Sequence, residues 1–323
     1  MRFTLLILSV VGAFALCILS GSVEIPASDV LRILAGQDAG TPAWSYIVWQ
    51  MRVPAGIAAL LAGAALGATG LLLQSYFRNP LAGPSVLGIT SGANLAVAIV
   101  VLLCGSMAGM LTVAAAFAGA FAVLLVLLGL SHIVRQPVSL LIAGLLFSYL
   151  ANAILTLLNY SATADGVQAL MLWGMGSFSQ VGMQQLPLFA LLSGVPLLAS
   201  LGLVKPLNAW MLGGDYARNL GISPAAVRWG VILIAGLLCA VTTAWCGPIS
   251  FIGLSIPHVA RLLFHTDNHR TLLPASILLG AACALLCLCM STLPSGGRTL
   301  PVNALTPLFG VPVILYVLLR RNR

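Results

Sequence analysis

The chain has 323 residues, of which 60% are hydrophobic and 6% are charged, and its mean hydropathy is +1.10. This composition excludes a soluble globular protein and indicates a polytopic membrane protein. The formal net charge of +8 does not indicate a nucleic-acid partner, because the basic residues are scattered at the ends of apolar runs.

Ten apolar runs are long enough, or nearly so, to cross the roughly 30 Å hydrocarbon core of a bilayer. They lie near residues 3–20, 53–73, 84–103, 108–130, 138–158, 186–204, 229–246, 248–264, 272–290 and 302–319. The first run follows a basic residue, as in a signal peptide, but no A-x-A site follows it, so we interpret it as an uncleaved span. The predicted fold class is all-α, a single transmembrane domain over residues 1–323 with about ten helices.

Lysine and arginine residues determine the expected orientation, because they are in excess in cytoplasmic loops. With the N-terminus inside, ten alternating spans place eleven basic residues inside and three outside. The inside residues are Arg2, Arg78, Arg135, Lys205, Arg218, Arg228, Arg261, Arg270, Arg320, Arg321 and Arg323; the outside residues are Arg32, Arg52 and Arg298. We therefore expect a multi-pass protein of the inner (cytoplasmic) membrane with both termini in the cytoplasm.

Two regions differ from simple spans. Residues 161–185 are polar but include Trp173, which predicts a short interfacial helix on the outer face with this ring at headgroup depth. Residues 79–92, NPLAGPSVLGITSG, are dense in Pro and Gly, and such backbone is tolerated at membrane depth only where protein or a water-filled cavity covers it. Residues 247–257, GPISFIGLSIP, weakly echo residues 83–90, which is either chance or a sign of two related halves with broken helices.

A polar stretch, LGGDYARNLGISPAAVR at 212–228, lies between two apolar runs. Asp215 can cap a short helix that runs to Leu220, and Gly221 suits the left-handed residue that ends such a helix. Ser223 before a proline is a second helix start. We expect two short helices folded against each other on the cytoplasmic side, either as a docking surface or as a rigid connector.

Several kinds of chemistry are absent from the sequence. No GxxxxGK[ST] motif is present and the only lysine is Lys205, so the chain is not expected to hydrolyse ATP or to be an enzyme by itself. The seven cysteines form no CxxC pair and no zinc-site spacing with histidine, so we expect no metal site and interpret them as small apolar packing residues. We interpret His258 and Arg261 as an interfacial pair that reaches water rather than as an ion relay.

Much of the chain also resembles the FecCD-type permease subunits of ABC importers, which take up iron–siderophore complexes, haem and cobalamin. The matching stretches are WQMRVP at 49–54, GAALGATGLLLQ at 63–74, NPLAGPSVLGITSGA at 79–93, LLIAGLLFS at 140–148, LMLWGMGSF at 170–178, the loop at 214–221 and GPISFIGLSIPHVAR at 247–261. The resemblance runs from about residue 45 to the C-terminus, almost without gaps.

The resemblance implies a homodimer of ten-helix subunits in the lipid membrane. Two separate ATPase subunits would bind ATP and dock on the cytoplasmic face, and a periplasmic or extracellular substrate-binding protein would dock outside. The implied ATPase-coupling residues are Gly213, Gly214, Asp215, Ala217, Arg218, Leu220, Gly221 and Ser223. The implied cytoplasmic gate consists of Asn79, Leu81 and Val138, and Arg52 is implied at the outer docking surface. The expected translocation pathway includes Asn152, Thr156 and Asn159, with Leu170 and Trp173 at the outer mouth.

The chain departs from the family pattern near its ninth span. Where the family usually has an Asp, an Arg four residues later and a Glu before a Leu-Pro pair, this chain has Leu288, Thr292 and Thr299, and Asn303 replaces a usual glycine. Arg298 either substitutes for the missing arginine in binding-protein docking or only caps the span in the headgroups.

Two other functional classes compete with an importer permease. An ion-coupled secondary transporter would need charged groups at the membrane midplane, and a membrane enzyme would need an acidic cluster or a metal site. Six acidic residues, spread as they are, supply neither arrangement. The sequence does not identify which metal chelate is carried.

Overall fold

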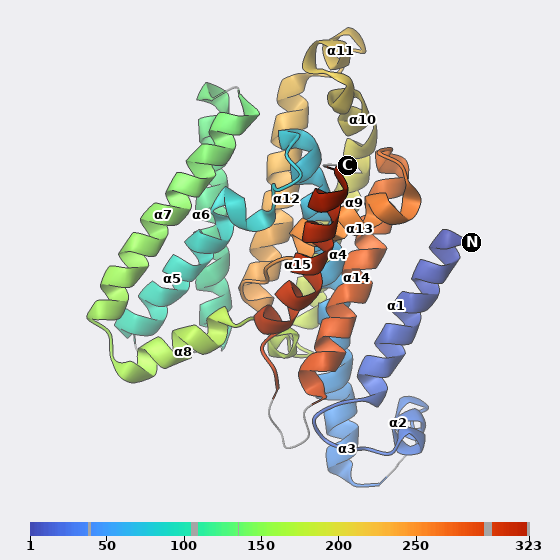
Figure 1. Ribbon diagram of the computed structural model, residues 1–323. Coiled ribbons are helices and arrows are strands. Elements are labelled where there is room, and N and C mark those ends of the chain that lie inside the picture. Colours follow the sequence, from blue (N-terminus) through green and yellow to red (C-terminus); the bar gives the residue numbers. More distant parts are fainter. Residues whose placement is uncertain (38–39, 105–108, 135, 294–298, 322–323) are drawn as a thin grey trace.

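The computed structural model describes residues 1–323 except 38–39, 105–108, 135, 294–298 and 322–323 (Figure 1). The described residues form helices and no strands, and a helix covers most or all of each predicted span. These helices are α1 (Arg2–Leu19), α4 (Val53–Phe77), α5 (Ile89–Cys104), α6 (Gly109–Ile133), α7 (Pro137–Tyr160), α9 (Leu186–Ser200), α12 (Pro224–Cys246), α13 (Ile252–Phe264), α14 (His269–Thr292) and α15 (Val302–Arg321). Among the described residues, seven helical segments are long and apolar enough to cross a membrane, and α5, α13 and α15 supply three shorter apolar helices. The predicted all-α polytopic fold is confirmed, and the count of ten spans includes these three.

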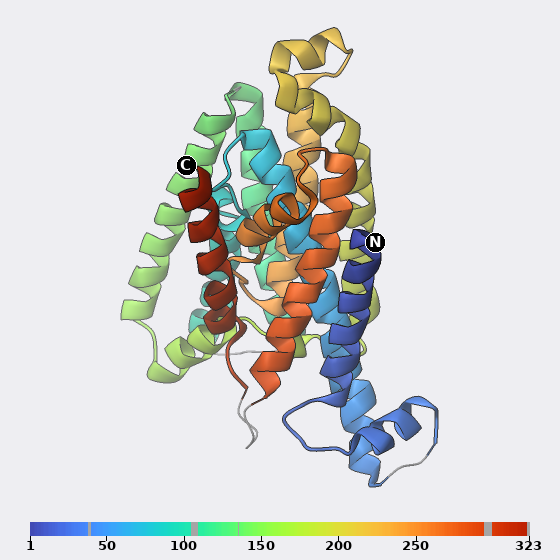
Figure 2. The ribbon, with the colours of Figure 1, turned by 45° about the vertical axis from the view of Figure 1, so that its right-hand side comes forward.

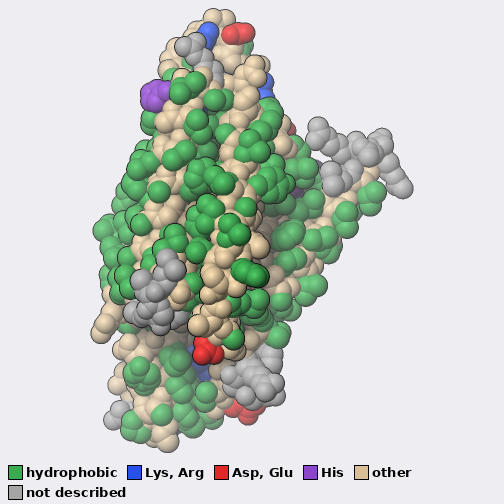
Figure 3. Space-filling view, turned by 90° about the vertical axis from the view of Figure 1, so that its left-hand side faces the viewer, with side chains coloured by type: hydrophobic (Ala, Val, Ile, Leu, Met, Phe, Trp, Pro, Cys, Tyr) green, Lys and Arg blue, Asp and Glu red, His purple; other side chains and the backbone are tan. Residues whose placement is uncertain are grey.

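The short connecting elements gather at the two ends of the helix bundle (Figures 1 and 2). One end carries α2 (Ala27–Leu34), α3 (Pro42–Tyr46) and α8 (Ala164–Gly174), and we call it the α8 end. The opposite end carries α10 (Val204–Leu212) and α11 (Gly214–Asn219), and we call it the α11 end. Between the ends, hydrophobic side chains cover the middle of the face that Figure 3 shows. This is the distribution that a bilayer requires of a spanning protein.

Helix α4 lies inside the bundle and contacts α9, α12, α13 and α14 (Figures 1 and 2). Almost every residue of α4 is buried, and the helix is rich in alanine and glycine. A Cβ atom at Gly63 would overlap the carbonyl oxygen of Gly280 in α14, and one at Gly70 would overlap the carbonyl oxygen of Gly253 in α13. The absence of side chains at these points lets backbones approach closely, which is the usual basis of helix packing in membranes.

Two breaks interrupt the helical pattern next to α4. Pro84–Leu87 forms a 3-10 turn and α5 begins only at Ile89, so the predicted start of that span at 84 is wrong. Residues 247–251 are not helical. Phe251 has a φ of 66°, and across it Ile252 N donates a hydrogen bond of 2.8 Å to the Ser250 carbonyl. The first break contacts the start of α13, which directly follows the second, because a Cβ at Gly253 would lie 2.8 Å from the Pro84 ring.

The structure predicts that Gly70→Ala destabilises the folded chain. The added methyl group has no space against the Gly253 carbonyl, and overpacking of this kind costs about 1–3 kcal/mol. Gly129→Ala is a matched control, since nothing lies within 4 Å of a Cβ at that position in α6. Thermal unfolding in detergent should show a lower midpoint for Gly70→Ala and an unchanged or higher one for Gly129→Ala. Equal midpoints would contradict the close packing of α4.

Candidate functional site

The loop at the α11 end is compact, and its short helix ends in a hydrogen-bonded turn. Gly213, with φ 140° and ψ 145°, separates α10 from α11. Gly221 is left-handed at φ 76°, as predicted, and α11 ends with hydrogen bonds of 2.9 Å from Ile222 N to Ala217 O and from Gly221 N to Arg218 O. This pair of bonds is the Schellman arrangement, which satisfies the free carbonyls at a helix end. The loop is therefore a folded unit rather than a flexible connection.

The start of α11 differs from the prediction. Helix α11 begins at Gly214 with Gly213 as its N-cap, and no side chain caps it, so the predicted capping role of Asp215 is wrong. Asp215 lies in the first turn, where its carboxylate interacts favourably with the helix dipole. The second start is confirmed, because Ser223 Oγ accepts a hydrogen bond of 3.4 Å from Ala226 N at the beginning of α12.

A polar groove of about 660 Å³ adjoins this loop at the α11 end. Its lining includes Asp215, Arg218 and Arg228 from the loop and His132 from the end of α6. Asp215, Arg218 and Leu220 are exposed, whereas Ala217 is fully buried. The exposed side chains are available to a partner, and Ala217 holds α11 against the rest of the chain.

The predicted gate residues lie at the same end of the bundle. Asn79 directly follows the left-handed Arg78 that ends α4, and its Oδ1 accepts a hydrogen bond of 2.9 Å from Leu81 N. Leu81 is 49% exposed and Val138, in the first turn of α7, is 62% exposed. Two large apolar side chains are therefore presented at the α11 end by segments that follow prolines. Their role as a gate stays a prediction.

A polar network that sequence reasoning missed fixes the end of α4. Gln74 accepts a hydrogen bond of 2.8 Å from Arg261 Nη1 and donates one of 3.0 Å to the Leu254 carbonyl. His258 is 6% exposed and its Nε2 lies 2.9 Å from the Pro80 carbonyl. The interpretation of His258 as a residue that reaches water is therefore wrong. For Arg261 it left out the hydrogen bond to Gln74. Gln74, a polar residue near the end of an apolar run, was the available signal.

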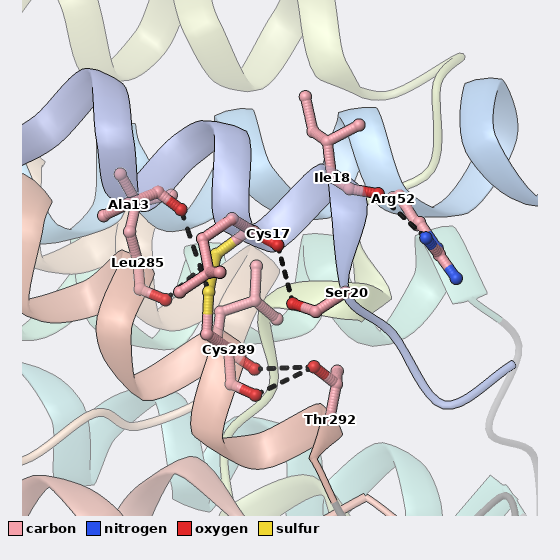
Figure 4. Close-up of a disulfide and its surroundings, with 10 residues drawn as sticks. Ala13, Cys17, Ile18, Ser20, Arg52, Leu285, Cys289 and Thr292 are labelled. Carbon is pink, nitrogen blue, oxygen red and sulfur yellow. Dashed lines mark hydrogen bonds between the residues drawn. A yellow bond between two sulfur atoms is a disulfide. The ribbon is translucent and has the colours of Figure 1, made fainter. Parts of the chain in front are cut away.

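At the α8 end, Arg52 is buried and turned toward Ile18 of α1, to which Figure 4 shows its hydrogen bond. It is 7% exposed, and its guanidinium donates hydrogen bonds to the carbonyls of Ile18 at 2.8 Å, Leu19 at 3.1 Å and Val23 at 2.5 Å. Ile18 and Leu19 belong to the last turn of α1, where carbonyls lack helical partners and the helix dipole favours a cation. The structure thus gives Arg52 an internal role, and docking by Arg52 stays a prediction.

A disulfide joins α1 to α14 beside this arginine. Cys17 and Cys289 are bonded, with their Cα atoms 5.1 Å apart (Figure 4). The interpretation of every cysteine as an apolar packing residue is therefore wrong for these two. Their separation of 272 residues explains why no local motif revealed the pair.

The positions that depart from the family pattern lie around the same arginine. Leu288, Thr292 and Thr299 line a pocket of about 230 Å³ together with Arg52. Thr292 Oγ1 donates to carbonyls of its own helix, at 3.0 Å to Cys289 and 3.3 Å to Leu288. Arg298 lies outside the described residues, so its docking role stays a prediction.

The predicted pathway residues fall into two groups. Asn152 and Thr156 are exposed on α7, and Asn159 is partly buried. Leu170 and Trp173 are 9% and 4% exposed, because they are on the side of α8 that packs against the chain's own core. The Trp173 ring therefore packs inward, and its expected headgroup depth stays a prediction. No three His, Cys, Asp or Glu side chains among the described residues are grouped so as to hold a metal ion.

Comparisons with known proteins agree on one family. The model of the FecCD transport family matches residues 6–320. The vitamin B12 import system permease protein BtuC of Salmonella paratyphi A is 36% identical over 314 residues, which cover 95% of each chain. Its counterpart in Salmonella typhi is 35% identical with the same coverage. A solved inward-facing structure of a putative metal-chelate type ABC transporter superposes with a TM-score of 0.85 and 28% identity, covering 98% of this chain and 97% of the other.

Replacement of Arg52 tests its internal role. Arg52→Met retains an apolar stem but leaves three carbonyls without their donor, and a buried unsatisfied group costs about 1–3 kcal/mol. Arg32→Met is the control, since its side chain is 62% exposed and forms only a surface ion pair with Asp29 at 3.7 Å. We expect a lower unfolding midpoint in detergent for Arg52→Met alone. A midpoint unchanged from that of the original chain would show that Arg52 does not stabilise the end of α1.

Proposed function

Because the chain belongs to the FecCD transport family, we propose that it carries a metal chelate across the inner membrane, powered by separate ATPase subunits and supplied by a substrate-binding protein. The chain is a permease of the ABC-importer type. The observation that carries the proposal is the folded α10–α11 loop, which projects from one end of an apolar bundle (Figure 1). A compact polar loop of this kind supplies a docking surface for a soluble motor.

We place the α11 end in the cytoplasm, with both termini on that side. The basic residues Arg78, Lys205, Arg218, Arg228, Arg261 and Arg270 belong to segments at or near the α11 end, and Arg32 and Arg52 belong to segments at the α8 end. This asymmetry supports the orientation, because cytoplasmic loops are enriched in basic residues. The disulfide between Cys17 and Cys289 gives independent support. It lies near the α8 end, and disulfides persist in oxidising compartments outside the cytoplasm.

The ATPase contact would use the exposed part of residues 212–228, which we call the coupling loop. Asp215, Arg218 and Leu220 would face the ATPase, while Gly213, Gly221 and Ser223 set the directions of the helices that present them. Gly214 begins α11, and the buried Ala217 fixes it.

A second copy of the chain would complete the pathway. One face of α7 exposes large apolar and aromatic side chains, including Tyr149 at 63% and Leu157 at 72%. Asn152 and Thr156 are exposed on the same helix. Two copies arranged with these helices facing each other would enclose a cavity of mixed character, suited to a bulky chelate. Leu81 and Val138 would close this cavity toward the cytoplasm.

Cobalamin is the first substrate to test, since the vitamin B12 permeases are 35–36% identical to this chain over 95% of its length. Iron–siderophore complexes and haem are the other chelates that the family resemblance includes. Docking of the binding protein would involve the α8 end, with Arg298 as the basic residue proposed to remain available and Arg52 held internally.

The substrate can be assigned by transport in liposomes that contain the chain with its co-purifying ATPase and cognate binding protein. Uptake of cobalamin should require ATP and exceed uptake of ferric siderophore and haem under matched conditions. Uptake driven by an ion gradient without ATP would contradict the importer assignment. Faster uptake of another chelate would retain the importer and correct its substrate.

A second prediction concerns the coupling loop. Gly221→Val forces a β-branched residue into the left-handed region, which strains the end of α11. Gly36→Val is a matched control at the α8 end, because Gly36 has the same φ of 76° and likewise has nothing within 4 Å of its Cβ position. Only Gly221→Val should reduce ATPase co-purification and transport. Normal transport by Gly221→Val would remove the coupling role from this loop.

A further inference from the structure

Helices α4 and α10 end beside each other, and a side chain from each caps the other. Trp210 Nε1 of α10 donates a hydrogen bond of 3.0 Å to the Tyr76 carbonyl of α4. Arg78, which directly follows α4, donates from Nη2 to the Trp210 carbonyl. Each carbonyl lies in the last turn of its helix. Carbonyls there lack the N–H partners that the helix supplies elsewhere. We call Tyr76, Arg78 and Trp210 the reciprocal cap.

Ring contacts reinforce the reciprocal cap. The rings of Tyr76 and Trp210 are stacked, with centroids 5.6 Å apart and an interplanar angle of 19°. The Arg78 guanidinium carbon lies 5.6 Å from the centroid of the Trp210 ring. Indole is the most favourable ring for a cation, and a planar guanidinium can stack and donate at the same time. Small displacements between α4 and α10 would therefore weaken four contacts together.

The reciprocal cap lies between the coupling loop and the predicted gate. Trp210 is three residues before Gly213, the N-cap of α11. Arg78 directly precedes Asn79 and is three residues before the exposed Leu81. Arg78 itself is left-handed, with φ 49° and ψ 34°, and turns the chain out of α4. The backbone turn that sets the direction of the gate segment, residues 79–81, thus occurs at Arg78, whose side chain is held by α10.

Buried and partly buried hydrogen bonds join the same helix ends to α14. His269 of α14 contacts Ser75 Oγ of α4 at 2.6 Å and Asn208 Oδ1 of α10 at 2.7 Å. Asn208 Oδ1 also accepts from His269 N at 2.9 Å. The ends of α4, α10 and α14 therefore form one hydrogen-bonded unit, in which Arg78 of the reciprocal cap directly precedes residues 79–81.

We propose that Arg78 and Trp210 are positioning residues that transmit displacement of the α10–α11 loop to the gate segment 79–81. This inference rests on the proposed function, in which an ATPase partner moves that loop. When the loop moves, α10 moves the end of α4 with it through the reciprocal cap, and Leu81 changes its exposure. Without the cap, the ATPase would still bind and hydrolyse ATP, but the gate would respond less.

The test measures the labelling rate of Leu81→Cys by a maleimide in the complex with ATPase, with and without a non-hydrolysable ATP analogue. Labelling of the chain without this substitution is subtracted. We expect the nucleotide to change the rate, and Trp210→Leu or Arg78→Gln to reduce that change by about 2- to 30-fold. Trp210→Phe keeps the stacked ring and loses only the N–H donor, so its effect should be intermediate. Combining Trp210→Leu with Arg78→Gln should add little, since both remove one unit.

Arg270→Gln is the matched control, because Arg270 is an exposed arginine at the same end and its side chain makes no hydrogen bond or ion pair among the described residues. It should preserve the nucleotide effect. A nucleotide effect of the original size in Trp210→Leu and Arg78→Gln complexes, or the loss of ATPase binding along with it, would overturn the positioning role. If no ATPase binds the chain without these substitutions, the proposed function fails instead, and the two failures are distinguished.

Discussion

The close approach of backbones around α4 is the constraint on which the rest of the structure depends. Gly63 and Gly70 leave no space for a methyl group against α14 and α13, so α4 can occupy the middle of the bundle and be buried over most of its length. Without water in the hydrocarbon region, apolar burial alone does not bring helices together, and packing of small residues takes its place. The break at Pro84 lies against this centre, and Pro84 is buried, as irregular backbone at membrane depth requires.

An arginine lies at each end of α4, and each is held by the end of another helix. Arg52 precedes α4 and binds the carbonyls that end α1, while Arg78 follows α4 and binds a carbonyl near the end of α10. The chain has 14 basic residues and only 6 acidic ones, so most cations cannot pair with carboxylates. Carbonyls at helix C-termini carry partial negative charge and need donors, and they supply the missing partners. The position of the central helix is thus fixed by charge as well as by packing.

Features set by local sequence were predictable from sequence, and those set by distant contacts were not. The span ranges followed from hydropathy, and Gly221 and Ser223 followed from helix-end rules that depend on a few neighbouring residues. The predicted cap at Asp215 was wrong because the helix begins two residues earlier, at Gly214 with Gly213 as its N-cap. The Cys17–Cys289 bond and the inward hydrogen bond of His258 depend on partners 272 and 178 residues away. The family resemblance identified where functional segments lie, but it did not show that Arg52 faces inward.

The α8 end of the bundle is held by a disulfide and by buried polar contacts, and this bears on how a partner docks there. At the α8 end a disulfide joins α1 to α14, and Arg52 is held by three carbonyls next to a pocket lined by Leu288 and Thr292. No described acidic side chain forms an ion pair with Arg52, and Arg32 is already paired with Asp29. The free charge at this end is acidic among the described residues, because Glu24 and Asp165 are exposed and form no described ion pair. Recognition by a binding protein that docks here would then combine shape and hydrogen bonding with contacts to these two carboxylates, and only the carboxylate contacts would be screened strongly by salt.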